Sequence, residues 1–332
     1  MELSIYSGFL FILISGTFSG IFSTPFNRNK QWAWENNWLI WSMVALIICP
    51  FIAVYFTIPN VFAVYSSNLS TTAIIAAFGV IWGISALLFG KGIDFLGVSL
   101  AIPIMQGLIS SIGTIVPFLI NSPSDLLNPA YYNIPLGVLV ILAGIILYAI
   151  AGKGKDKASN KPGSNFKVGL IICILAGVFG PMINFGFVFG EPLQDTAIQL
   201  GAESIYSANA TWAVIFTTGF IVNALQCIFL LKKNKTMALY KRATFSNYLW
   251  AAMAGILWYG SILLYGMGCN FMGEHAASIG WAIMQATAIL ASNVAGIIMG
   301  EWKNASKASL IKMAGGMCFL ILGVIIISMS TK

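Results

Sequence analysis

Long apolar runs separated by short polar breaks follow one another from one end of the chain to the other. Each run is long enough, at about 1.5 Å per residue, to cross a hydrocarbon core about 30 Å thick. Runs such as 39–55 and 136–150 are apolar on every side, whereas barrel strands would alternate apolar and polar residues. The pattern predicts an all-α membrane protein with ten transmembrane helices, at roughly 4–24, 38–57, 71–90, 97–119, 134–151, 168–190, 206–231, 247–268, 276–299 and 311–329.

The composition excludes a soluble fold. Of the 332 residues, 58% are hydrophobic and 8% are charged, and the mean hydropathy is +0.88. A soluble domain of this length cannot bury so much apolar surface. The first apolar run continues into Pro25 and Arg28 without a small-residue cleavage site, so we expect a retained helix rather than a signal peptide. The five cysteines show no metal-type spacing, and we expect no disulfide, metal or cofactor.

The basic residues predict the orientation of the chain in the membrane. Of the 17 basic residues, 16 fall in odd-numbered loops between the predicted helices, and only Lys332 lies elsewhere. Basic loops stay on the cytoplasmic side, so we expect a multi-pass protein of a bacterial inner (cytoplasmic) membrane with both termini outside. The net charge of +7 therefore reflects topology in a lipid bilayer and does not indicate binding to nucleic acid.

An internal repeat divides the chain into halves. Residues 82–97 (WGISALLFGKGIDFLG) and 258–273 (WYGSILLYGMGCNFMG) share eight of sixteen positions, and 99–106 (SLAIPIMQ) and 278–285 (SIGWAIMQ) both contain Ile-Met-Gln. The repeat predicts two five-helix units, 1–151 and 168–332, joined by a basic cytoplasmic linker, 152–167. An odd number of helices per unit inverts the second unit, and inverted repeats are typical of secondary transporters. A duplication retained only for packing is the alternative.

Uncharged polar residues inside the predicted helices are the candidates for binding a small polar solute. Gln106 and Gln285 occupy equivalent places in the two halves, and amides suit hydroxyl groups. We expect a substrate-binding set that adds two further amides and four aromatic rings that offer flat faces to a sugar: Asn184, Asn223, Trp82, Trp258, Tyr259 and Trp281. Each amide could equally join helices together.

Other aromatic residues and the prolines have structural interpretations. Four tryptophans flank the second predicted helix, and we expect them to form an interfacial aromatic belt: Trp32, Trp34, Trp38 and Trp41. The prolines inside helices are expected to break them beside a cavity, with ordinary helix kinks as the alternative: Pro103, Pro117 and Pro181.

Glu274 and His275, the single histidine, are the candidates for proton coupling. They lie in the offset between the two repeats, at the outer entrance of the ninth predicted helix. A histidine titrates near neutral pH, and burial would raise the pKa of a glutamate into the same range. The alternative is a helix N-terminal turn that faces water, where an acidic residue is favoured by the helix dipole.

Several segments resemble the bacterial L-rhamnose-proton symporters of the drug/metabolite transporter superfamily. The resemblance covers 25–35 (PFNRNKQWAWE) with Trp38, Trp82-Gly83, Gly90, 96–99 (LGVS) and 300–305 (GEWKNA). It implies ten helices in two inverted repeats and the import of a sugar together with protons. A carrier or exporter of another small polar metabolite is the alternative.

An enzyme is not expected. The predicted helices contain no paired carboxylates at helical spacing, no metal cluster and no nucleophile beside a base. The sequence makes no prediction of the oligomeric state.

Overall fold

The computed structural model describes residues 2–121, 132–159, 166–272 and 276–329, and all regular structure in these ranges is helical. The first half contains α1 (Glu2–Ile21), α2 (Trp34–Met43), α3 (Cys49–Thr57), α4 (Val61–Ser66), α5 (Leu69–Leu96), α6 (Val98–Asn121) and α7 (Asn133–Ser159). The second half contains α8 (Phe166–Phe179), α9 (Met182–Phe189), α10 (Glu191–Gln199), α11 (Ala208–Lys233), α12 (Ala238–Lys241), α13 (Phe245–Met272), α14 (Ala276–Ile298) and α15 (Lys307–Ser328).

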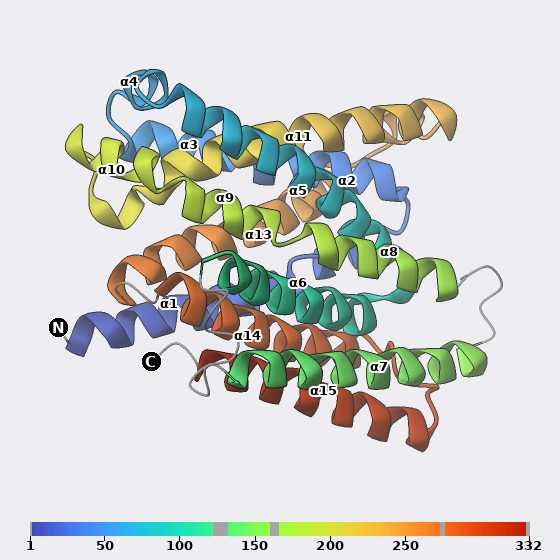
Figure 1. The fold of residues 1–332 in the computed structure, drawn as a ribbon. Helices are drawn as coiled ribbons and strands as arrows, with labels where there is room; N and C mark the ends of the chain where they lie inside the picture. Colours follow the sequence, from blue (N-terminus) through green and yellow to red (C-terminus); the bar gives the residue numbers. More distant parts are fainter. Residues whose placement is uncertain (1, 122–131, 160–165, 273–275, 330–332) are drawn as a thin grey trace.

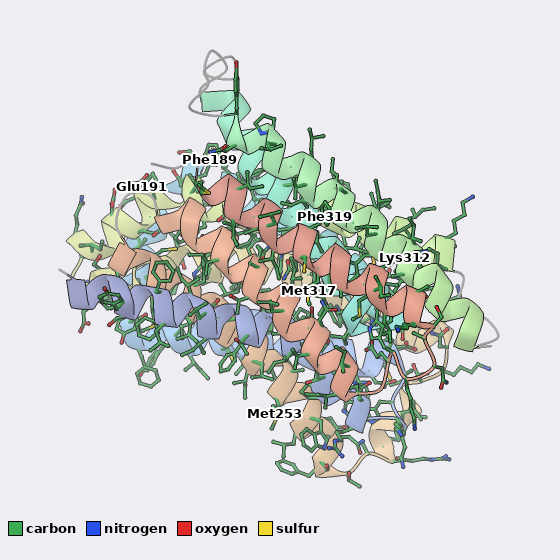
Figure 2. The ribbon with its side chains drawn as sticks, turned by 90° about the horizontal axis from the view of Figure 1, so that it is seen from below. Phe189, Glu191, Met253, Lys312, Met317 and Phe319 are labelled. Atoms are coloured by element: carbon green, nitrogen blue, oxygen red, sulfur yellow. The ribbon has the colours of Figure 1, made fainter. Side chains whose placement is uncertain are left out.

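The described residues contain eight helical segments that are long and apolar enough to cross a membrane. Shorter apolar stretches, Leu100–Gly113 on α6 and Ile283–Ile298 on α14, lie where two more spans were expected. Large apolar side chains cover the outside of the bundle, among them Met253 of α13 and Phe319 of α15 (Figure 2). A bundle with apolar outer faces matches a lipid environment, so the chain is an all-helical, multi-pass membrane protein.

The helix boundaries follow local chemistry. The chain turns between α8 and α9 at Gly180 and Pro181, which confirms the predicted interruption at Pro181. In contrast, α6 runs without interruption through Pro103 and Pro117, so the predicted breaks there are wrong. Another difference is that α7 continues to Ser159, eight residues beyond its expected end at 151, into the predicted linker.

Two buried apolar clusters hold the helices together. One is built mainly from α2, α3, α5, α9, α11 and α13, and the other mainly from α6, α7, α8 and α15, while α14 contributes to both. In Figure 1, α5 and α11 lie in the upper part of the bundle, α7, α14 and α15 lie in the lower part, and α8 and α9 pass between them. Helix α1 packs against α13 and α14. The boundary between the two clusters is where the candidate site lies.

A tight connection joins α5 to α6 at Gly97, whose φ of +81° and ψ of 167° are accessible almost only to glycine. A Cβ at this position would lie 2.7 Å from Glu301 Oε2. The other carboxylate oxygen, Glu301 Oε1, accepts a hydrogen bond of 3.0 Å from the Val98 backbone N–H. The carboxylate therefore caps the start of α6 and links it to the connection that follows α14.

We expect Gly97→Ala to lower the thermal unfolding midpoint of the detergent-purified protein, because alanine adds both backbone strain of about 1–3 kcal/mol and a clash with Glu301. Gly300→Ala is the matched control, since Gly300 also has a positive φ (+75°) but would meet nothing within 4 Å. The control should show the smaller loss. Equal midpoints for the two variants would mean that the contact with Glu301 does not restrict position 97.

Candidate functional site

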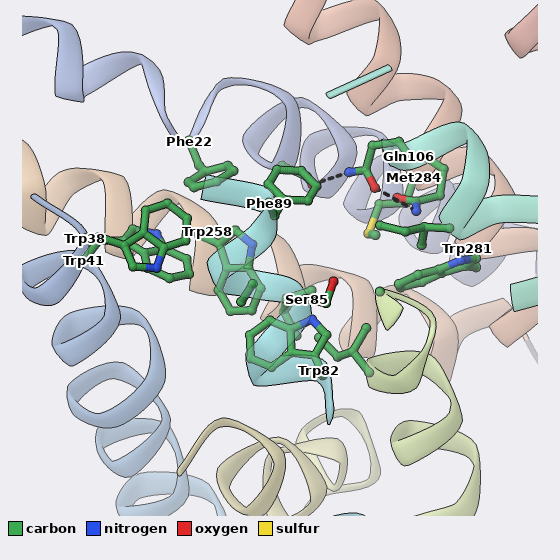
Figure 3. Close-up of a pocket in the computed structure, with 17 residues that line it drawn as sticks. Phe22, Trp38, Trp41, Trp82, Ser85, Phe89, Gln106, Trp258, Trp281 and Met284 are labelled. Carbon is green, nitrogen blue, oxygen red and sulfur yellow. Dashed lines mark hydrogen bonds between the residues drawn. The ribbon is translucent and has the colours of Figure 1, made fainter. Parts of the chain in front are cut away.

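A cavity with about 560 Å³ of empty space, counting its open part, lies at the boundary between the two clusters. Its lining comes from both halves of the chain, and the buried apolar residues in it belong to the first cluster. Figure 3 shows aromatic rings on one side of the cavity and Gln106, Met284 and Trp281 on another.

Aromatic side chains form the first wall, which consists of Phe22, Trp38, Trp41, Trp82, Phe89 and Trp258. Trp38 and Trp41 stack with centroids 4.2 Å apart, and Trp82 and Trp258 stack at 5.3 Å. The two stacked pairs meet edge to face, because the ring centroids of Trp41 and Trp258 lie 5.5 Å apart and their ring planes are inclined at 75°. These contacts fix the rings, so the wall offers rigid flat faces rather than adaptable ones.

Amides form the polar wall. Gln285 Nε2 on α14 donates a hydrogen bond of 2.9 Å to Gln106 Oε1 on α6. In turn, Gln106 Nε2 donates to Ser19 Oγ on α1 at 3.3 Å. Both glutamines are buried, at 5% and 1% exposed for Gln106 and Gln285. The wall therefore presents an ordered polar chain that joins three helices.

Among the residues that the structure describes, none that lines this cavity carries an ionisable side chain. The site therefore suits an uncharged polar molecule, because an ion would be taken out of water without a countercharge. A further lining hydroxyl, Ser85 Oγ, already donates to the Ala176 carbonyl at 2.8 Å. In the described part of the chain, no group of three histidine, cysteine, aspartate or glutamate residues could hold a metal ion.

The structure brings together five of the eight residues predicted to bind substrate. Those in the cavity lining are Gln106, Gln285, Trp82, Trp258 and Trp281. The other three lie outside it and are engaged elsewhere. Tyr265 donates to Asn184 Oδ1 at 3.3 Å, and Tyr259 donates to Asn209 Oδ1 at 3.5 Å.

Asn223 is the third residue outside the lining, and it connects three helices. Its Oδ1 accepts a hydrogen bond of 2.8 Å from Trp38 Nε1, and its Nδ2 donates to the carbonyls of Gly83 and Gly219 at 3.2 and 2.8 Å. This is the helix-joining role that a buried amide can take. Asn223 thus orients Trp38, which does line the cavity.

The belt prediction is wrong for Trp38 and Trp41, which are 2% and 1% exposed and line the cavity. Their stacking and the bond from Trp38 to Asn223 draw them inward. Trp32 is also buried, edge-on to Tyr240 and Tyr248. Trp34 stacks on Trp38 and lies under the Lys91 ammonium, with Nζ 3.8 Å from the ring centroid.

Close to the start of α2, a polar cluster joins the two halves of the chain. Glu35 is 3% exposed, and its Oε1 accepts hydrogen bonds from Asn234 Nδ2 at 2.9 Å and Thr236 Oγ1 at 2.7 Å. Asn36 Nδ2 donates to the Thr236 carbonyl at 3.1 Å. These bonds hold the aromatic end of α2 against the connection that follows α11. Glu274 and His275, the predicted proton-coupling pair, lie outside the described residues.

Comparison with known proteins decides the family. The family model of the L-rhamnose-proton symport protein (RhaT) matches residues 1–331. The chain belongs to this family. An L-rhamnose-proton symporter of Escherichia coli (strain SMS-3-5 / SECEC) is 30% identical over 342 residues, which cover 99% of each chain. The same protein of Citrobacter koseri is 29% identical over 340 residues, again 99% of each chain.

Two further likenesses complete the comparison. An L-rhamnose-proton symporter of Shigella boydii serotype 18 is 30% identical over 335 residues, 97% of this chain and 96% of its own. A solved crystal structure covers 98% of this chain at 13% identity with a TM-score of 0.48, a likeness too distant to inform the fold. Membership in the RhaT family confirms the predicted resemblance and makes the chain a membrane transporter rather than an enzyme.

Two of the segments that carry the RhaT-family resemblance meet in the structure. The first contains Gly97 and Val98, and the second contains Glu301, whose carboxylate caps α6. The RhaT-family chain thus links α6 to α14 through the Gln106–Gln285 bond inside the bundle, and to the connection that follows α14 through the cap at the start of α6.

Proposed function

We propose that this protein imports L-rhamnose together with protons by alternating access. The observation that supports the proposal is the cavity, which combines the aromatic wall with a pair of buried amides and no ionisable side chain among its described lining residues. Apolar faces suit the carbon face and the methyl group of a deoxyhexose, and amides suit its hydroxyl groups. The relatives' names, L-rhamnose-proton symporter, support this substrate and its coupling to protons.

We further propose ten transmembrane helices in two inverted repeats, 1–151 and 168–332, joined by the linker 152–167. The pattern of helix contacts supports a two-fold relation in which each helix of the first repeat has a counterpart in the second. The pairs are α1 with α8/α9, α2/α3 with α11, α5 with α13, α6 with α14, and α7 with α15. Contacts of α1 with α13 and α14 are matched by those of α8 with α5 and α6. Likewise, α5 packs on α11 as α13 packs on α2, and α6 and α7 each pack on their own counterpart.

The arrangement of the walls suggests how a bound sugar would couple the two halves of the bundle. The aromatic wall brings tryptophans from α2, α5 and α13, whereas the two glutamines lie on α6 and α14. A sugar that stacks on the rings and hydrogen-bonds to the glutamines would hold these two groups of helices together. Motion of one group of helices relative to the other would then expose the site to alternate sides of the membrane.

Proton coupling and orientation complete the proposal. We propose that Glu274 and His275, at the outer entrance of the ninth predicted helix, accept the proton from the outside. A histidine titrates near neutral pH and can therefore take up and release a proton there. The loop charges support cytoplasmic odd-numbered loops and both termini outside, in the bacterial inner membrane.

Binding of L-rhamnose should change the tryptophan fluorescence of the purified protein saturably, because five lining residues are tryptophans: Trp38, Trp41, Trp82, Trp258 and Trp281. Trp258→Phe should reduce the amplitude of the change, whereas Trp250→Phe, outside the lining, should leave it intact. The same titration with a panel of small polar metabolites tests the alternative substrates. A saturable response to another metabolite, with none to L-rhamnose, would transfer the proposal to that substrate.

A further inference from the structure

The polar wall of the cavity ends in a buried acceptor that is not used. Hydrogen bonds run in one direction, from Gln285 Nε2 to Gln106 Oε1 and from Gln106 Nε2 to Ser19 Oγ. Among the described residues, no group donates to Gln285 Oε1, although the residue is only 1% exposed. A buried carbonyl without a donor bears the full cost of its lost hydration.

The chain cannot satisfy itself by turning its amides. The Gln285 amide gives its N–H to Gln106, so its oxygen is the group that is left over. If both amides were rotated by half a turn, the Gln285 carbonyl would accept from Gln106, and the Gln285 NH₂ group would have no partner instead. Each amide has one carbonyl acceptor and one NH₂ donor group, and Gln106 can pair with only one of the two. Either way, Gln285 keeps one unpaired polar group beside the cavity, and the structure assigns it as an acceptor.

We propose that one ring hydroxyl of the substrate donates a hydrogen bond to Gln285 Oε1, so that Gln285 selects for a donor at that position of the sugar. The proposal rests on the proposed function. It predicts a specificity that the aromatic wall cannot provide, because stacking depends on the shape of a ring and not on one hydroxyl. Sites that use a buried polar group in this way strongly reject analogues that lack the matching group.

A hydroxyl reaches this enclosed oxygen only when a lining side chain gives way. Met284 precedes Gln285, also lines the cavity and is 2% exposed. An unbranched thioether chain changes its conformation easily. A shift of such a side chain would open a path for the sugar hydroxyl to Gln285 Oε1.

Monodeoxy and monodeoxyfluoro derivatives of L-rhamnose test the proposal, because fluorine keeps the size of a hydroxyl and cannot donate a hydrogen bond. Dissociation constants are measured by calorimetry on the purified full-length protein. At one ring position, both derivatives should bind at least about tenfold more weakly than L-rhamnose. The ratio of the derivative's dissociation constant to that of L-rhamnose is the gap that the experiment measures. In Gln285→Met, which keeps the length of the side chain without the amide, this gap should fall below about threefold.

Asn293→Leu is the matched control. Asn293 is another fully buried amide of α14, but it lies outside the cavity lining and donates to the Ile289 carbonyl at 2.9 Å. This variant should keep the full gap between L-rhamnose and its derivatives. Should Gln285→Met fail to fold, Gln285→Glu retains an acceptor oxygen and should keep the gap as well.

The outcomes separate the inference from the function on which it rests. No binding of L-rhamnose by the unaltered protein overturns the proposed function, and the inference falls with it. Binding of L-rhamnose with fluoro derivatives that bind equally well at every position overturns the inference alone, as does a gap that is unchanged in Gln285→Met.

Discussion

Transport is expected to fall at least about 100-fold in kcat/KM when Gln106 and Gln285 are both replaced by leucine. The two amides join α6 to α14 beside the cavity by a hydrogen bond of 2.9 Å, and they are the buried amides of its lining among the described residues. Leucine keeps approximate size and removes every donor and acceptor. Initial rates of substrate uptake into proteoliposomes, normalised to inserted protein, measure the loss.

The single variants sharpen this expectation. Removing one amide leaves the other buried without its partner. The losses of transition-state stabilisation in Gln106→Leu and Gln285→Leu should therefore not add up to the loss in the double variant, and the difference should be about 0.5–3 kcal/mol. Ser111→Ala is a control on α6, since its hydroxyl is buried, donates to the Gly107 carbonyl and lies outside the lining. Uptake that is unchanged in the double leucine variant would remove the two glutamines from the site.

The contact between α5 and α11 should make Gly83→Ala strongly destabilising. A Cβ at Gly83 would lie 2.8 Å from the Cα and carbonyl oxygen of Gly219, and backbone atoms cannot move aside without separating the helices. Close approach of helices through small residues is a common packing device in membranes. Overpacking of this kind costs about 1–3 kcal/mol, and we expect a lower thermal unfolding midpoint.

Gly260→Ala is the opposite case. A Cβ at Gly260, in the middle of α13, would lie 3.5 Å from the nearest atom of Phe18, which is an ordinary contact. Alanine favours a helix over glycine by up to about 1 kcal/mol, so this variant should be neutral or slightly more stable. A loss of stability at position 260 as large as that at position 83 would contradict the packing account.

The helices and the amide pair could be predicted from the sequence because they rest on local or repeated patterns. Apolar runs mark the spans, and the repeat of Ile-Met-Gln placed Gln106 and Gln285 at equivalent positions, where the structure joins them by a hydrogen bond. The break at Pro181 follows from the chemistry of proline, whereas Pro103 and Pro117 sit within a continuous α6. Local rules cannot tell these prolines apart, since neighbouring helices can support a helix that contains proline.

The aromatic wall could not be predicted because it depends on contacts between distant segments. Trp38 and Trp41 stand near a helix end, where tryptophans usually face the membrane interface. Asn223, 185 residues away from Trp38, gives the indole N–H a buried partner and so draws the ring inward. The same bond explains why Asn223 lies outside the lining: its amide is used by Trp38 and by two backbone carbonyls.

Uptake of labelled L-rhamnose into proteoliposomes, with and without an imposed inward proton gradient, tests the central claim most directly. A gradient of the same size across vesicles treated with a protonophore is the control. The proposed function predicts accumulation that depends on the gradient and is abolished by the protonophore. Correctly inserted protein that takes up no L-rhamnose under either condition would contradict it.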